Sequence, residues 1–83
     1  MTVAEMIEDI AFAALDILVV TPAGRVNFRF DIDHVSEDEN MVYMEDADGR
    51  PFELNKDSMV KLEEDGTYSI DRDGCLFCIK LSV

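Results

Sequence analysis

Two cysteines near the C-terminus have the spacing of a redox or zinc motif, with only Leu76 and Phe77 between Cys75 and Cys78. A redox pair normally begins a helix, whose N-terminal dipole lowers the pKa of the thiol, whereas this pair lies in a segment typical of a strand. On a strand the two side chains point to opposite faces about 10 Å apart, beyond the ~7 Å limit for a disulfide. Zinc would need two further ligands, and His34 is the only histidine. We therefore expect unbridged thiols and no metal site.

Two Asp-x-Asp-Gly segments imitate the middle of a calcium-binding EF-hand loop. If Gly49 is the sixth position of such a loop, Met44 and Asn55 occupy the first and twelfth positions. The equivalent positions around Gly74 also lack a carboxylate, so both segments miss the first ligand and the bidentate carboxylate. Asp and Gly are preferred in turns, and we interpret both segments as hairpin turns.

The remaining polar residues form no recognisable catalytic set. With one histidine and no serine in a nucleophile elbow, a triad is not indicated. The four glycines are scattered singly, so a phosphate-binding loop is absent as well. Carboxylates are too abundant for one pair to stand out as acid and base. We expect no enzyme, no cofactor and no metal.

A helix is expected from Thr2 to about Asp16. Thr2 and Glu5 have the spacing of a capping box, and the apolar residues that follow gather on one side of the helix. Phe12 departs from this pattern, because it projects from the middle of the acidic side. Either the helix ends or bends early, or the ring is offered to a partner.

The rest of the chain alternates with a period of two, which is typical of strands. Asp-Gly steps at 48–49, 65–66 and 73–74 indicate hairpins between them. The strand-like segments are Ile17–Thr21, Arg25–His34, Met41–Glu45, Phe52–Leu54, Met59–Glu63, Tyr68–Asp71 and Cys75–Leu81.

These patterns predict a single α+β domain over residues 1–83. An N-terminal amphipathic helix packs on a small twisted antiparallel β-meander of five or six strands, which can curl toward a barrel. The expected core residues are Met6, Ile7, Ile10, Val26, Phe28, Phe30, Ile32, Leu54, Phe77 and Ile79.

The charge balance indicates which partners the chain can have. In 83 residues, 7 Lys and Arg stand against 19 Asp and Glu, for a net charge of −12, while 48% of the residues are hydrophobic. Such a chain folds, and its field repels nucleic acids and anionic membranes, so a basic protein is the natural partner.

No apolar run reaches the ~20 residues of a membrane span, and Glu5, Glu8 and Asp9 stand where a signal peptide needs positive charge. We expect a cytoplasmic protein.

Acidic residues concentrate in two places. One is a stretch of eighteen residues from Asp31 to Asp48 that has no Lys or Arg, and the other comprises Glu63, Glu64, Asp65, Asp71 and Asp73. Carboxylates at i and i+2 on a strand stand about 6.6 Å apart. Successive phosphates on one nucleic-acid strand have a comparable separation, because their step of about 3.4 Å is measured along the helix axis and the winding of the strand adds to it. A fold could thus present a phosphate-like row to a basic nucleic-acid-binding cleft. Tyr43, if outward, is a second candidate beside Phe12 for an aromatic anchor. The expected partner-binding residues are Asp31, Asp33, Glu37, Asp38, Glu39, Asp46, Asp48, Glu63, Glu64, Asp65 and Phe12.

Two hypotheses of function follow. In the first, the protein is an inhibitor that mimics nucleic acid; small acidic phage proteins that block restriction or CRISPR effectors (anti-restriction and anti-CRISPR proteins) are similar to it in size and charge. In the second, it is a homo-oligomeric regulatory or structural module, acidic only for solubility, that buries Leu76, Cys78 and Phe12 between subunits. The order of a helix before a small antiparallel sheet resembles RNA-binding barrels of the Sm type, whose RNA-binding role an acidic surface contradicts.

Overall fold

The computed structural model describes residues 1–10 and 13–82, which contain one short helix and an antiparallel sheet. The elements are α1 (Val3–Ile10), β1 (Ala14–Thr21), β2 (Gly24–Glu37), β3 (Met41–Asp46), β4 (Pro51–Asn55), β5 (Lys61–Leu62), β6 (Tyr68–Arg72) and β7 (Cys75–Leu81).

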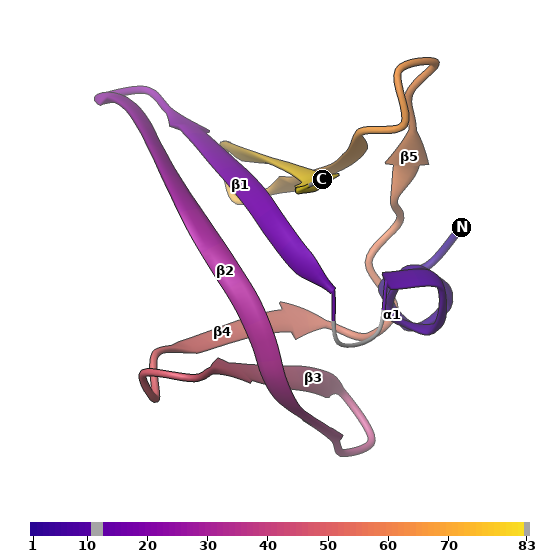
Figure 1. Ribbon diagram of the computed structural model, residues 1–83. Helices are drawn as coiled ribbons and strands as arrows, with labels where there is room; N and C mark the ends of the chain where they lie inside the picture. The colour runs from indigo at the N-terminus through magenta and orange to yellow at the C-terminus, as the bar shows by residue number, and fades with distance from the viewer. Residues whose placement is uncertain (11–12, 83) are drawn as a thin grey trace.

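The described strands form one seven-stranded sheet in the order β4-β3-β2-β1-β7-β6-β5. The long strand β2 belongs to two arms, because its first part pairs with β1 and its last part pairs with β3. In Figure 1, β3 and β4 cross behind the lower half of β2, while β1 runs beside its upper half. The α+β class and the hairpin succession are as expected. The strand number and the barrel are wrong: every strand-like segment pairs, even the two-residue β5, and the order of strands is open.

The helix is shorter than its sequence pattern indicates. The capping box is present, since the Glu5 backbone N–H donates to Thr2 Oγ1 at 3.3 Å and the Thr2 N–H donates to Glu5 Oε1 at 3.1 Å. The helix ends at Ile10, however, and β1 already begins at Ala14. Alternation explains the change, because Leu15 and Ile17 are buried by pointing inward from a strand. Phe12 lies outside the described residues.

The hairpin turns follow the Asp-Gly steps. Asp73 and Gly74 both have positive φ, 50° and 80°, and connect the paired residues Arg72 and Cys75. Two residues of positive φ match the right-handed twist of the strands they join, and Asp-Gly tolerates this conformation. Asp48-Gly49 and Asp65-Gly66 lie in the longer β3–β4 and β5–β6 connections. The hairpin interpretation of all three steps is confirmed.

The core lies on the inner side of the curved sheet, under α1. Six of the expected core residues are buried there: Met6, Ile10, Phe30, Ile32, Leu54 and Ile79. Three more are partly buried against it: Ile7, Phe28 and Phe77. Val26 is wrong, because it is 60% exposed near the tip of the β1–β2 hairpin, which projects at the upper left of Figure 1.

One aromatic side chain joins the two arms of the sheet. The Phe52 ring on β4 lies 6.4 Å from Phe28, 5.9 Å from Phe30 and 5.8 Å from Phe77, measured between ring centroids. Arg72 on β6 adds a hydrogen bond from Nη1 to the carbonyl oxygen of Glu53, at 3.0 Å. The β3–β4 arm is therefore held against the β6–β7 arm by side chains, without strand pairing. In the described part of the chain, no helix is long and apolar enough to span a membrane.

Candidate acidic binding face

Tyr43 stands on the outward face of the β3–β4 arm. Its neighbours along β3, Val42 and Met44, are buried in the core, so the alternation turns Tyr43 to the other side. Strand pairing places it directly between Ser36 on β2 and Glu53 on β4. The condition set by the sequence, that Tyr43 points outward, is met.

A hydrogen bond fixes the Tyr43 side chain to the β2–β3 turn. The phenol donates to Asp38 Oδ2 at 2.7 Å, and Asp38 Oδ1 accepts the backbone N–H groups of Asn40 and Met41 at 2.7 and 2.8 Å. The bond from Tyr43 and these two N–H groups lower the pKa of Asp38 below its ordinary value. The same bond to the carboxylate raises the pKa of Tyr43. Asp38 is therefore a fixed anion beside the ring.

Two further carboxylates border the ring. Glu53 lies directly opposite Tyr43, and Glu45 lies two residues farther along β3, opposite His34 and Pro51. Glu45 and Glu53 are thus diagonal neighbours, about 7–8 Å apart. Within residues 1–10 and 13–82, neither forms an ion pair with Lys or Arg. We name this surface the Tyr43 face and define it by Tyr43, Asp38, Glu45 and Glu53.

Three expected residues adjoin the Tyr43 face at the β2–β3 turn or the β3–β4 turn. Glu37 ends β2 and pairs with Lys56 Nζ at 3.3 Å, while Glu39 is exposed in the next turn. Lys56 Nζ also donates to the Asp38 carbonyl oxygen at 3.2 Å, so this cation lies at the rim. Asp48 is exposed in the β3–β4 turn. The β2–β3 turn therefore keeps a surplus of negative charge.

Asp31 and Asp33 lie on β2 before the Tyr43 face. Both are exposed, but Asp31 Oδ1 accepts a hydrogen bond from Arg29 Nε at 2.9 Å, which balances its charge locally. The pairing of β2 with β3 is irregular between Ile32 and His34, and Asp33 lies within this irregularity. The regular row of carboxylates expected along β2 is therefore interrupted.

Asp46 has a structural role and is not available to a partner, contrary to expectation. Its residue is only 3% exposed, and Oδ1 accepts the backbone N–H groups of Asp48 and Arg50 at 3.0 and 2.8 Å. Arg50 Nε donates to Oδ2 at 2.6 Å. Burial alone raises the pKa of Asp46, but the Arg50 N–H and guanidinium outweigh it and lower this pKa. Asp46 closes the β3–β4 turn.

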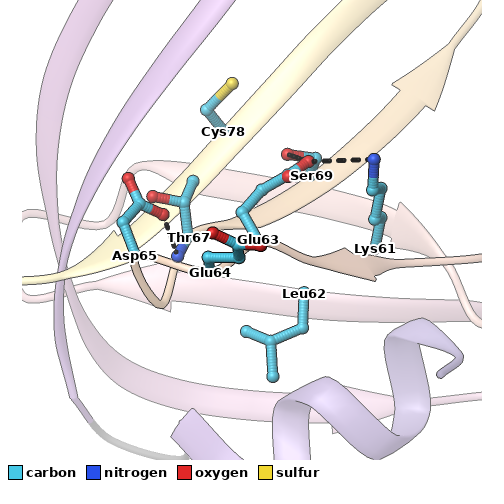
Figure 2. Close-up of a pocket in the computed structure, with 8 residues that line it drawn as sticks. All are labelled: Lys61, Leu62, Glu63, Glu64, Asp65, Thr67, Ser69 and Cys78. Carbon is cyan, nitrogen blue, oxygen red and sulfur yellow. Dashed lines mark hydrogen bonds and ion pairs between the residues drawn. The ribbon is translucent and has the colours of Figure 1, made fainter.

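The second acidic concentration lies at the other end of the molecule. Figure 1 shows the β5–β6 turn, in orange, at the top right and the β2–β3 turn at the bottom. Glu63, Glu64 and Asp65 line an open hollow of about 720 Å³ at the β5–β6 turn (Figure 2). Glu63 accepts a hydrogen bond from Ser69 Oγ at 3.3 Å. The Thr67 backbone N–H donates to Asp65 at 2.9 Å, and this bond lowers the pKa of Asp65. The two concentrations do not form one surface.

The cysteines lie on β7 as free thiols, and both are partly buried. Cys78 pairs across the sheet with Leu18 and Ser69, on the outward side, whereas Cys75 follows the β6–β7 turn. In the described ranges no group of three or more His, Cys, Asp or Glu side chains is arranged to hold a metal ion.

The expected partner-binding residues do not include Glu45 and Glu53, which the structure places beside Tyr43. The alternation of Phe52, Glu53 and Leu54 turns Glu53 outward. Counting back from Asp48-Gly49 as a two-residue turn would set Leu54 opposite Tyr43, whereas the structure sets Glu53 there. The sequence therefore indicates that Glu53 points outward, but not that it borders Tyr43.

Comparisons with known proteins give no relative: no protein-family model, no curated protein and no solved structure matches this chain.

Proposed function

We propose that this protein binds the basic nucleic-acid-binding cleft of another protein, in the place of the nucleic acid. The observation that carries the proposal is the Tyr43 face, where an outward aromatic ring is bordered by three carboxylates. Lys56 lies only at its rim, bound to Glu37 and to the Asp38 carbonyl oxygen. A surface of this kind fits a cleft lined by Lys and Arg.

The spacing of the carboxylates supports mimicry of a nucleic-acid backbone. Glu45 and Glu53 stand about 7–8 Å apart as diagonal neighbours, on the scale of neighbouring phosphates. Asp38 is held in one position by three hydrogen bonds, so little side-chain entropy is lost when a cation binds it. A preorganised anion binds a basic partner better than a mobile one.

Tyr43 supplies an aromatic anchor, which charged side chains alone do not provide. Aromatic residues are enriched among the few interface side chains that carry most of the binding energy. Its hydroxyl group already donates to Asp38, so burial of the ring leaves no unpaired polar group. The ring can therefore stack on an Arg side chain or on an apolar wall of the cleft.

The net charge of −12 acts over a longer range than these contacts. It steers the protein toward a basic cleft and speeds association, and this contribution weakens as salt screens it. Partners of this chemistry include restriction and CRISPR effectors, and binding to them places the protein in the cytoplasm.

Affinity capture tests the proposal. The tagged protein is incubated with host lysate at about 50 mM salt, and the captured proteins are identified by mass spectrometry. We expect nucleic-acid-binding proteins that are released as the salt concentration rises. Capture of no such protein, or capture that is insensitive to salt, would contradict the proposal.

Matched charge reversals then locate the contact surface. The variant E45K/E53K changes the Tyr43 face, and the control E8K/D9K makes the same change in net charge at two exposed residues of α1. We expect E45K/E53K to lose binding at least tenfold more than the control does. Equal losses would show that only net charge matters and that the Tyr43 face is not the contact surface.

A further inference from the structure

The outward side of the β1–β7 arm carries an apolar block on two central strands. Val20 on β1 lies directly opposite Leu76 on β7, and Leu18 lies directly opposite Cys78. None of the four belongs to the hydrophobic core, and Leu76 is 39% exposed. In an antiparallel sheet with one solvated face, the outward positions are normally polar. This block needs an explanation that the core does not provide.

Charges around the block are balanced, unlike those of the whole chain. We define the neutral face as the outward positions of five strands together with Glu63. The strands are β1, β5, β6, β7 and the part of β2 that ends at Asp31. This face carries four of the seven basic and four of the nineteen acidic residues of the chain, so the entire net charge of −12 lies elsewhere. The charged residues of the face are Arg25, Arg29, Lys61, Lys80, Asp16, Asp31, Glu63 and Asp71.

Two adjoining hollows give the neutral face relief. One, of about 480 Å³, is lined by Leu76 and by Met59, which is 70% exposed. The other is the hollow of about 720 Å³ that reaches Cys78, and its far side is lined by Glu64 and Asp65 of the β5–β6 turn, which lie outside the neutral face (Figure 2). Both are lined by Lys61, Glu63 and Ser69, so they lie side by side.

We propose that the neutral face binds a second copy of this chain in a two-fold symmetric dimer. Two molecules of charge −12 repel one another, and contact through this face brings no net charge of either copy into the interface. Positive and negative side chains alternate across it, as in the paired positions Arg29, Asp16 and Lys80. A surface with both signs interspersed can match its own two-fold copy.

The area agrees with a weak but specific dimer. The face has fifteen outward positions. Each covers about 4.8 Å across the strands and about 6.8 Å along them, so the face covers roughly 500 Å² per copy. That is about a tenth of the 5262 Å² surface of the chain. A dimer would bury roughly 1,000 Å² in total, the lower limit for a specific interface, so we expect a dissociation constant in the micromolar range.

This inference does not depend on the proposed function, because Tyr43 lies on the other arm, outside the neutral face. Sedimentation equilibrium of the purified protein tests it without any other partner. We expect a mass of twice 9.4 kDa at high protein concentration. We also expect that the affinity of the dimer does not fall between about 50 and 300 mM salt, because salt screens the repulsion between the two copies. A monomer at every concentration up to about 1 mM, far above a micromolar dissociation constant, would overturn the inference.

A matched pair of variants locates the interface. L76K places a charge in the apolar block, while V26K makes the same kind of change at an exposed apolar residue outside the face. We expect L76K to weaken the dimer at least tenfold and V26K to leave it unchanged. An equal effect of both variants, or no effect of L76K, would show that the copies meet elsewhere.

The two free thiols give a second measurement that needs no variant. Cys78 lies in the block and Cys75 lies at the β6–β7 turn, and both are partly buried. We expect alkylation of Cys78 to slow as protein concentration rises, at an unchanged rate for Cys75. Rates that are independent of concentration at both thiols would contradict the inference, even if L76K failed to fold.

Discussion

Truncation of Phe52 should weaken both the fold and the Tyr43 face. Its ring is the contact between the β3–β4 arm and the β7 strand, with Phe28, Phe30 and Phe77 around it at 5.8–6.4 Å. The next residue, Glu53, points outward beside Tyr43. Phe52→Ala therefore removes the side chain that holds the Tyr43 face against the rest of the sheet.

The size of the effect follows from burial and ring contacts. Full truncation of a core Phe costs about 3–5 kcal/mol, and the partly buried Phe52 ring loses roughly half of that. Each aromatic pair adds about 0.5–1.5 kcal/mol beyond burial. Because the three pairs share one ring and their energies overlap with burial, we take the lower end of the sum and expect a loss of about 3 kcal/mol for Phe52→Ala. For a domain of this size that lowers the unfolding temperature by about 10–25 °C. Phe52→Leu keeps most of the volume and should cost about 1–2 kcal/mol.

Urea unfolding followed by circular dichroism measures these free energies. A double-mutant cycle with Phe52→Leu and Phe77→Leu isolates the contact between the arms, with an expected coupling of about 0.5–1.5 kcal/mol. A loss below about 0.5 kcal/mol for Phe52→Ala, the size expected at a surface position, would refute the packing described here. Strict additivity of the two Leu variants would refute the direct ring contact.

Two further predictions concern the carboxylates. Tyr43→Phe removes the largest cause of the lowered Asp38 pKa, so NMR titration of the Asp38 carboxyl carbon should show this pKa rise toward its ordinary value; an unchanged pKa would show that the phenol does not donate to it. The pKa values of Asp38, Asp46 and Asp65 are all lowered in the folded state, so their stabilising contribution is present above the unfolded pKa of about 3.8 and is lost as the pH falls through the lower folded values. Thermal unfolding between pH 7 and 2 should therefore show a falling midpoint below about pH 4, and a midpoint that rises there would contradict the sign.

The hairpins were predictable because their determinants are local. Asp73-Gly74 meets the requirement of a two-residue turn for two positive φ angles, and no distant contact is needed to see it. Alternation then assigns the inward side chains of each strand, which is why Phe30, Ile32 and Ile79 were identified correctly.

The errors arose where distant contacts decide. The helix pattern continues through Ala14, but strand pairing of Ala14 with Asp31 and burial of Leu15 end the helix earlier. Tertiary packing overrides local helix propensity in this way. Val26 has the correct alternation but lies where the hairpin extends beyond the core.

The Tyr43 face was predicted only in part, because a sequence does not show which charged side chains are buried or paired with one another. Asp46 and Asp48 look alike in the sequence, yet Asp46 is buried with Arg50 and Asp48 is exposed. The β5–β6 turn, which carries Glu63 and Glu64, lies far from the β2–β3 turn (Figure 1), although both turns are acidic. Only the register of β3 and β4 shows that Glu53 borders Tyr43.

Competition with nucleic acid tests the central claim most directly. A captured partner is saturated with a fluorescent duplex that it binds, and this protein is then titrated in at fixed salt concentration. We expect displacement of the duplex by the protein and by E8K/D9K, with E45K/E53K requiring at least tenfold more. Formation of a ternary complex, in which partner, duplex and protein migrate together, would contradict occupation of the nucleic-acid cleft.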